Sequence, residues 1–320
     1  MELPSLAELE SAAARLRPFV PPTPQYAWPL LGKRFGATVW VKHENHTPIG
    51  AFKVRGGLIY LRDFRRRFPD SPGVIAATRG NHGQSIAFAA RQQGDRAKLI
   101  VPEDNSREKN AAMCAWGGEL IVHGHDFQAA LEHAQRLAHD EHWHFVPSFH
   151  RDLVQGVGTA YLEMLRAVPE LDILYVPIGL GSGICGAIAA RNALGHRAKI
   201  VGVVADGAPC YALSFTQRQA VATDRVDTFA DGLACRTPNA EALPVILAGA
   251  ERIVRVTDAE IASAIRAYYH DTHQLTEGAG AAALAAALQE KAHLADQQIG
   301  VALTGGNIDR ELYRSILAAE

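Results

Sequence analysis

Short apolar runs alternate with amphipathic segments along most of the chain. Runs such as Gly73–Ala77 (GVIAA) and Ala97–Val101 (AKLIV) have the length of a strand and carry few polar residues. Each is followed by a longer segment in which apolar positions recur with the spacing of a helix. Strand-length apolar runs that are joined by helices predict parallel strands with helical crossovers.

The expected elements fall into two series, which predict two lobes with a ligand-binding cleft between them. An acidic amphipathic helix and a proline-rich extended connection, Phe19–Trp28, precede them, and an irregular connection, Asp206–Thr237, interrupts the second. The first series has strands Thr38–His43, Gly73–Ala77, Ala97–Val101, Glu119–Val122 and Trp143–Val146, with helices Gly57–Arg67, Gly83–Gln93, Glu108–Trp116 and Asp126–His139. The second has strands Ile173–Pro177, Lys199–Val204, Arg252–Val256 and Gly300–Leu303, with helices Gly156–Val168, Gly183–Ala193, Asp258–His273 and Gly278–Lys291.

Composition narrows the class of partner. The chain has 320 residues, of which 48% are hydrophobic and 21% charged, and its formal net charge is -2. This balance offers no basic field for nucleic acid and no polybasic anchor for a membrane, so we expect a small-molecule partner. The N-terminal segment lacks the features of a signal peptide, and the four cysteines are too far apart to suggest a disulfide framework or a zinc site. We therefore expect a cytoplasmic protein.

The stretch Lys42–Gly57 (KHENHTPIGAFKVRGG) contains the first candidate for chemistry. In it Lys53 follows Phe52 and two small residues and leads into a glycine pair. A crowded lysine loses its proton more easily, and the neutral amine is the form that attacks an aldehyde to give a Schiff base. A solvated lysine at the start of a helix is the alternative interpretation of this stretch.

A polar loop lies between the strand Gly73–Ala77 and the next helix. It reads Thr78-Arg79-Gly80-Asn81-His82-Gly83. Its glycines permit close approach to a ligand, and the helix that follows offers N–H groups to an anion. The alternative is an ordinary turn with an asparagine cap.

A second loop, rich in glycine, follows the strand Ile173–Pro177. Gly179, Leu180, Gly181, Ser182 and Gly183 precede a helix, where backbone amides and the helix dipole favour a phosphate. The loop is neither a dinucleotide fingerprint nor a P-loop. Asp206 keeps a dinucleotide in consideration, but a single phosphate monoester is the simpler ligand.

A third loop, Thr304-Gly305-Gly306-Asn307, ends the last predicted strand. The hydroxyl of Thr304 can point into the cleft and offer one neutral hydrogen bond to a heteroatom. Taken alone, this pattern is more often a turn than a site.

Together these pieces resemble the fold-type II pyridoxal-phosphate enzymes, and specifically the serine/threonine dehydratase and serine racemase group. The resemblance extends from about Thr23 to Asn307 and rests on four motifs in the family's order. They are Lys42-His43-Glu44 with Ile49–Gly57, Thr78–Gly83, Gly179–Gly183 and Thr304–Asn307. It implies an α/β fold like that of tryptophan synthase β, with two lobes that each hold a mostly parallel sheet flanked by helices. Residues 1–74 and 146–320 would form the large cofactor-binding domain, and 75–145 a small mobile domain carrying the asparagine loop.

The resemblance also implies a cofactor, pyridoxal 5'-phosphate, and a role for each motif. Lys53 would carry the cofactor as a Schiff base and then take the Cα proton of the substrate. Phe52 would pack on the ring and Thr304 would meet the pyridine nitrogen. The phenolic oxygen would bond to Asn81, the phosphate would lie on Gly179, Leu180, Gly181, Ser182 and Gly183, and the substrate carboxylate on Thr78, Arg79, Gly80, Asn81 and His82.

The implied reaction is the elimination of water from a β-hydroxy amino acid, which gives a 2-oxo acid and ammonia. A neutral partner such as Thr304 does not keep the ring nitrogen protonated, and this favours β-elimination over transamination. The substrate would be threonine, serine or a 3-hydroxyaspartate. The alternatives are a β-replacement synthase of the cysteine synthase kind, against which His82 argues, and a ligand-binding relative without catalysis.

Two departures from the family pattern stand out. Arg79 occupies the position where racemases present a serine base, and an arginine is a poor base. We expect Arg79 either to bind an anionic group of the substrate or to form a salt bridge. The family's cation site needs a second acid after Asp206, which Asp206–Tyr211 lacks, so we expect no metal.

Three further features have weaker interpretations. The histidine pairs lack a third ligand at metal spacing and are expected to be structural or exposed. Glu277 is expected to cap a helix or to support the cofactor, and Cys185 to be a buried small residue. The family suggests a homodimer.

Overall fold

Two separate sheets organise the chain, and residues 1–319 are described in this computed structural model. The larger sheet has six strands in the order β1-β2-β10-β7-β8-β9. Only β1 runs antiparallel to its neighbour, and the other pairs are parallel. Its strands are β1 (Gln25–Ala27), β2 (Thr38–His43), β7 (Ile173–Pro177), β8 (Lys199–Ala205), β9 (Arg252–Val256) and β10 (Gln298–Leu303).

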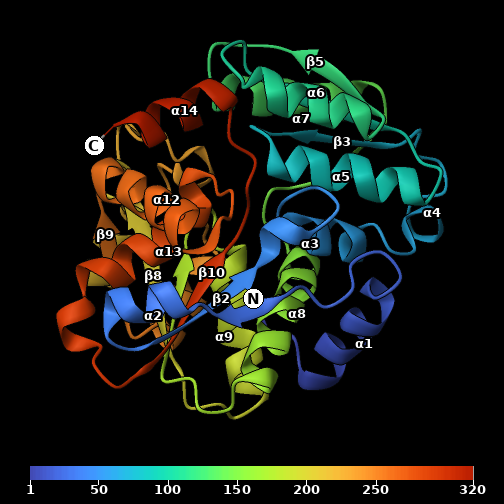
Figure 1. The fold of residues 1–320 in the computed structure, drawn as a ribbon. Coiled ribbons are helices and arrows are strands. Elements are labelled where there is room, and N and C mark those ends of the chain that lie inside the picture. Colours follow the sequence, from blue (N-terminus) through green and yellow to red (C-terminus); the bar gives the residue numbers. More distant parts are fainter. Residues whose placement is uncertain (320) are drawn as a thin grey trace.

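The smaller sheet has four parallel strands in the order β5-β4-β3-β6. It lies in the upper part of Figure 1, where its labelled strands β3 and β5 are blue-green and green. Its strands are β3 (Val74–Ala77), β4 (Ala97–Val101), β5 (Gly118–Val122) and β6 (His144–Phe145). The expectation of an α/β protein built on mostly parallel sheets is therefore confirmed.

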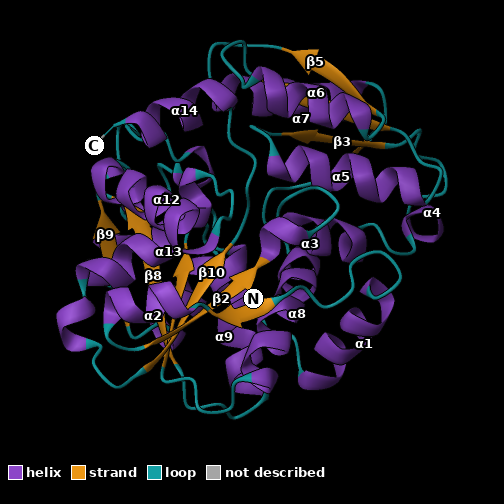
Figure 2. Cartoon of the chain, viewed as in Figure 1, coloured by secondary structure: helices purple, strands orange, loops and turns teal. Residues whose placement is uncertain are grey.

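Helices flank both sheets (Figure 2). The first half of the chain supplies α1 (Leu6–Leu16), α2 (Pro29–Phe35), η1 (Glu44–His46), α3 (Lys53–Tyr60), α4 (Phe64–Arg67), α5 (Asn81–Gln92), α6 (Arg107–Ala115), α7 (Phe127–Asp140) and α8 (Arg151–Ala167). The second half supplies α9 (Ser182–Ala193), α10 (Cys210–Gln217), η2 (Asp231–Leu233), α11 (Ala242–Gly249), α12 (Asp258–Thr272), α13 (Gly278–Gln289), η3 (Lys291–His293) and α14 (Arg310–Ala318).

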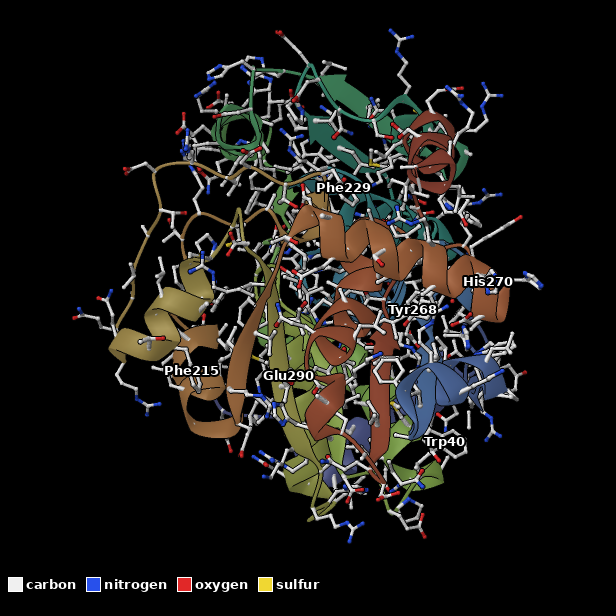
Figure 3. The ribbon with its side chains drawn as sticks, turned by 60° about the vertical axis from the view of Figure 1, so that its left-hand side comes forward. Trp40, Phe215, Phe229, Tyr268, His270 and Glu290 are labelled. Atoms are coloured by element: carbon white, nitrogen blue, oxygen red, sulfur yellow. The ribbon has the colours of Figure 1, made fainter. Side chains whose placement is uncertain are left out.

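The larger sheet is buried on both faces, which explains why its central strands are apolar throughout. Tyr175 of β7 packs with α12 and α13, whereas its neighbours Leu174 and Val176 pack with α8 and α9. Figure 3 shows Tyr268 on α12; its side chain is buried in the first of these layers, while His270 is exposed. The alanine-rich α13 is buried on every side because its small side chains let it lie between α12 and the sheet.

Local sequence explains where several helices begin. Ser5 and Glu8 form a capping box at the start of α1, and Thr257 and Glu260 form another at the start of α12. Each pair satisfies backbone N–H groups that the first turn leaves without partners.

Some predicted boundaries are wrong. The helix expected over Gly57–Arg67 begins four residues earlier, at Lys53, and is interrupted before α4, where Asp63 adopts a left-handed conformation. The helix expected from Gly83 begins at Asn81. The connection Asp206–Thr237 contains α10 and η2, and the pattern also missed β1, α2, α11 and α14.

No helix within residues 1–319 is long and apolar enough to cross a lipid bilayer.

Candidate functional site

The parallel arrangement of the larger sheet brings three loops to one edge. The central strands β2, β10 and β7 are neighbours, and their carboxyl ends lead to the Lys53 stretch, the Thr304 loop and the glycine loop. Ligands of open α/β sheets bind at this edge. The order of the strands therefore explains how segments far apart in sequence meet.

Lys53 is the first residue of α3, and its side chain points at the glycine loop. Its amine donates a hydrogen bond of 3.3 Å to Ser182 Oγ. Burial lowers the pKa of the Lys53 amine to about 8, and the negative charge of Glu277 opposes this shift. Burial therefore favours the neutral amine of Lys53 over its ammonium form.

The Thr304 loop fixes the position of the Lys53 stretch. The amide of Phe52 donates to the carbonyl of Thr304 at 2.9 Å, and Ala51 forms a β-bridge with Gly305. Gly50 has a φ of +68°, and a Cβ on it would come within 2.9 Å of Asn307 Oδ1. Glycine is therefore required where these two loops meet.

A buried arginine, Arg55, anchors α3 on the side away from the Thr304 loop. Arg55 donates to both carboxylate oxygens of Glu44, at 2.8 and 2.9 Å, and to both of Glu163, at 2.7 and 3.0 Å. Lys42 donates to Glu163 Oε2 at 2.6 Å. Glu44 follows β2 and Glu163 lies on α8, so this cluster joins three elements directly behind Lys53.

The glycine loop turns sharply into α9. Gly181 has a φ of +104°, and no side chain caps the amides at the start of the helix. The loop packs closely against α11, because a Cβ on Gly181 would lie 2.8 Å from Ala242 Cβ. Uncapped amides at a helix N-terminus attract an anion.

Tyr211 supports this loop and was missed in the sequence. Its hydroxyl donates to the carbonyl of Leu180 at 2.9 Å and accepts from the amide of Asn239 at 2.9 Å. It lies on α10, within a segment whose sequence pattern indicates irregular structure.

Phe52 lies beside both the Lys53 amine and the glycine loop. The Lys53 amine is 5.3 Å from the centre of the Phe52 ring. A Cβ on Gly183 would be 3.5 Å from that ring and 3.4 Å from the Tyr161 hydroxyl. A side chain at Gly183 would therefore be in ordinary van der Waals contact with Phe52 and Tyr161.

Asn81 begins α5, after β3 of the smaller sheet, and bonds to residues next to α13 and β10 of the other part of the chain. Its Nδ2 donates to Glu277 Oε1 at 2.6 Å, and its Oδ1 accepts from Asn307 Nδ2 at 2.8 Å. Glu277 precedes α13 and its side chain makes no capping hydrogen bond. Burial raises the pKa of Glu277 to about 7, although Lys109 acts to lower it.

Two other residues of the asparagine loop lie in the site: Thr78 is buried and His82 is half-buried. Thr78 Oγ1 accepts from the amides of Gly80 and Gly83, at 3.0 and 2.9 Å, so it closes the turn on itself. Burial lowers the pKa of His82 to about 3, with a smaller contribution from Lys53. Within the described chain, His82 Nε2 has no hydrogen-bond partner. A neutral imidazole near Lys53 is therefore free to bind a further group.

Arg79 points elsewhere. Its Nη2 is 3.4 Å from Asp104 Oδ1, and 33% of its side chain is exposed. Asp104 follows β4, the neighbour of β3, and is itself 63% exposed. Of the predicted site residues, Arg79 is the one that the structure pairs with a solvent-exposed acid.

Lys109 was also missed in the sequence. It is buried, and its ammonium lies 2.5 Å from Asp231 Oδ2 and 3.7 Å from Glu277 Oε2. In the sequence, Arg107-Glu108-Lys109 reads as a solvated charged helix face, and nothing local marks its partners.

The segment expected to lack a metal site contains an ion pair. Asp206 Oδ1 lies 2.7 Å from Arg255 Nη2. Among residues 1–319 there is no group of three or more His, Cys, Asp or Glu side chains that could hold a metal ion.

Comparisons with known proteins point to one family. A family model described as "Pyridoxal-phosphate dependent enzyme" matches residues 16–305. An L-threo-3-hydroxyaspartate ammonia-lyase from a Pseudomonas species is 31% identical, over 99% of this chain and 99% of that protein. An L-threonine ammonia-lyase from Geobacter sulfurreducens is 33% identical, over 94% of this chain and 75% of that protein.

Comparison with solved structures points to the same family as comparison of the sequences. The structure of maize serine racemase superposes with a TM-score of 0.92 at 27% identity, covering 98% of this chain and 97% of that one. This chain is therefore similar in its whole length to proteins of this fold.

Proposed function

This chain belongs to the family of pyridoxal-phosphate dependent enzymes, and we propose that it is a lyase that eliminates water from a β-hydroxy amino acid. The products are a 2-oxo acid and ammonia. The observation that carries the proposal is the position of Lys53, whose amine has a lowered pKa and contacts the uncapped start of α9. Relatives named as ammonia-lyases for hydroxyaspartate and threonine support the same reaction.

The residues present fit the cofactor. The uncapped amides of Gly179–Gly183 suit its phosphate, and Phe52, which lies beside both Lys53 and Gly183, suits packing against a flat ring. The Lys53 amine, the second N–H of Asn81 and the hydroxyl of Thr304 would meet its aldehyde, phenolic oxygen and ring nitrogen. When bound, pyridoxal phosphate supplies an aldehyde that joins covalently to an amine and a ring that withdraws electrons from it.

The chain's own groups then supply binding and proton transfer. Lys53 Nζ, partly neutral at pH 7, takes the proton from the substrate Cα. The hydroxyl of Thr304 cannot keep a ring nitrogen protonated, which favours elimination over transamination. Backbone amides at the start of α5 bind the substrate carboxylate, since a helix N-terminus attracts anions.

Elimination is distinguished from β-replacement by adding a nucleophile. With serine and excess sulfide, we expect the loaded protein to release pyruvate at the rate seen without sulfide. A synthase of the cysteine synthase kind would instead divert serine into cysteine. Separate quantification of pyruvate and cysteine decides between the two reactions, and a majority of cysteine would contradict the proposal.

Arg79 is proposed to select the substrate. Its exposed ion pair with Asp104 contributes little to stability, so the guanidinium can exchange this partner for an anionic group of a 3-hydroxyaspartate. We expect Arg79→Ser to lower kcat/KM about tenfold or more for 3-hydroxyaspartate and to leave threonine and serine nearly unchanged, because a hydrogen bond between charged groups is lost.

The control for this prediction is Asp104→Asn, which breaks the same ion pair but keeps the guanidinium. If Asp104→Asn reproduces the effect of Arg79→Ser, or if the order of substrate preference is the same in all three proteins, Arg79 serves only as a salt bridge.

We also propose an arrangement for the working enzyme. Residues 75–145 would form a small domain that moves against the large domain, 1–74 and 146–320. The protein would act as a homodimer in the cytoplasm, and the four free cysteines fit a reducing compartment. Sedimentation equilibrium of the loaded protein tests the oligomeric state, and a mass of one chain would contradict it.

A further inference from the structure

Lys109 links the two sheets through a buried charge. It lies on α6, beside the smaller sheet, and its side chain crosses Gly80, where a Cβ would come within 2.6 Å of Lys109 Cδ. Its ammonium reaches Asp231 at 2.5 Å and Glu277 at 3.7 Å. Both acids belong to the part of the chain that surrounds the larger sheet. A buried lysine is expected to be paired in this way, since an isolated ammonium is costly to bury.

Glu277 depends on Lys109 for its negative charge. Its side chain is nearly inaccessible, and Oε2 has no hydrogen-bond partner among the described residues. Burial favours the neutral acid, Lys109 favours the carboxylate, and the nearby charge of Asp231 again favours the neutral acid. Burial works against the ammonium of Lys109 as well, but Glu277 and Asp231 outweigh it and raise the Lys109 pKa.

The charge of Glu277 determines how the Asn81 amide can bond. An ionised carboxylate only accepts hydrogen bonds, so Asn81 must present Nδ2 to it. Asn307 donates to Asn81 Oδ1 at 2.8 Å, which requires the same orientation. The second N–H of Asn81 Nδ2 then has one fixed direction, toward the cofactor site. A protonated Glu277 could donate instead, and this requirement would be lost.

We propose that Lys109 is a positioning residue for the elimination, because it keeps Glu277 ionised and thereby fixes the orientation of the Asn81 amide in the cofactor site. This inference rests on the proposed function for its catalytic consequence. Lys109 need not touch the substrate or the cofactor. It acts through Glu277, across the junction between the two sheets.

The charged groups that face this pair come from several elements. Glu277 is influenced by Lys109 and Asp231, and its own charge acts on Lys53 of α3. Lys109 is influenced by Glu277, Asp231 and, more weakly, Asp309. Lys109 is thus the cation that lowers the Glu277 pKa, and its loss leaves Asp231 as an additional unpaired anion nearby.

The test compares pH profiles of kcat/KM for the loaded wild type, Lys109→Met, Lys109→Arg and Glu277→Gln. In the wild type we expect an ascending limb, in which kcat/KM rises with pH as Glu277 ionises. The Glu277→Gln variant should lack this limb. Lys109→Met should move this limb to higher pH by at least one unit, which is about a tenfold loss on its acidic side. Lys109→Arg should keep the limb in place because it keeps the charge.

A second readout needs neither cofactor nor activity. Since the folded pKa of Glu277 is raised to about 7, its contribution to stability is complete at acidic pH and is lost as pH rises through that value. In the cofactor-free protein we expect the urea midpoint of Lys109→Met to go on falling at higher pH than that of the wild type. Glu277→Gln should not show this dependence.

Lys98→Met is the matched control, because Lys98 is a largely buried lysine of β4, in the smaller sheet, and pairs with Glu141 instead. It should move neither the limb nor the pH dependence of the urea midpoint. The proposal is wrong if Lys109→Met lowers kcat/KM by one factor at every pH and leaves the urea profile parallel to wild type. A wild type without lyase activity would instead refute the proposed function, and the urea profiles would still decide whether Lys109 controls Glu277.

Discussion

Lys53→Ala is expected to lower the rate of 2-oxo acid release at least about a thousandfold, since a positioned proton-transfer group alone contributes about 10²–10⁴-fold. The variant also loses the amine that we propose to bond to the cofactor. Borohydride reduction of the loaded wild type should attach the cofactor to Lys53 irreversibly, and peptide mass mapping should find it there. In Lys53→Ala the same treatment should label no residue of this site.

Lys33→Ala is the control for this experiment, because Lys33 is exposed on α2 and takes no part in the site. It should keep wild-type activity and wild-type labelling. Labelling of a different lysine in the wild type, or a Lys53→Ala variant that retains activity, would contradict the role given to Lys53. A protein that binds cofactor without labelling or activity would be the non-catalytic relative.

Arg55→Met is expected to destabilise the protein by about 3–5 kcal/mol, the usual effect of breaking a buried ion pair from one side. Arg55 is fully buried between Glu44 and Glu163, and its loss would leave a buried and a half-buried carboxylate with Lys42 as their remaining cation. Urea unfolding should show a lower midpoint. Because α3 carries both residues, the same change should reduce loading of Lys53 with cofactor.

Arg166→Ala is a matched control. Arg166 also pairs with a glutamate, Glu10, but both side chains are about half exposed. Such pairs contribute less than about 1 kcal/mol. Adding Glu44→Gln to Arg55→Met should recover part of the lost stability, because one unpaired charge is removed. Equal midpoints for Arg55→Met and Arg166→Ala would show that the cluster does not anchor α3.

The sequence predicts best the strands of the parallel sheets. Four of them have the predicted bounds, because each is a short, mostly apolar or alternating run: β2 (Thr38–His43), β4 (Ala97–Val101), β7 (Ile173–Pro177) and β9 (Arg252–Val256). Their order along the chain also predicts the parallel pairing. These features are local, so they need no knowledge of distant contacts.

The start of α3 could not be predicted in this way. Gly56 and Gly57 are poor helix formers, and the sequence therefore favours a loop around Lys53. In the structure a Cβ on Gly56 would come within 3.1 Å of the Leu153 carbonyl, and Gly57 packs against Ser85. Close packing of α3 against two other helices requires these glycines and overrides their low propensity.

The charges around the site were the least predictable feature. Lys109 and Asp231 are 122 residues apart, and neither belongs to a recognisable motif. Glu277 was recognised as a possible helix cap, but its hydrogen bond to Asn81 depends on how the two sheets meet. Motifs thus indicate which residues bear chemistry, while the fold determines which charges they face.

The central claim is that this chain removes water from a β-hydroxy amino acid. Its most direct test is to measure 2-oxo acid and ammonia released by the cofactor-loaded wild type from threonine, serine, 3-hydroxyaspartate and, as substrates without the hydroxyl, alanine and aspartate. We predict equal amounts of 2-oxo acid and ammonia from at least one of the three hydroxylated amino acids and none from alanine or aspartate. No release from any hydroxylated substrate by protein with a fully loaded Lys53 would contradict the account.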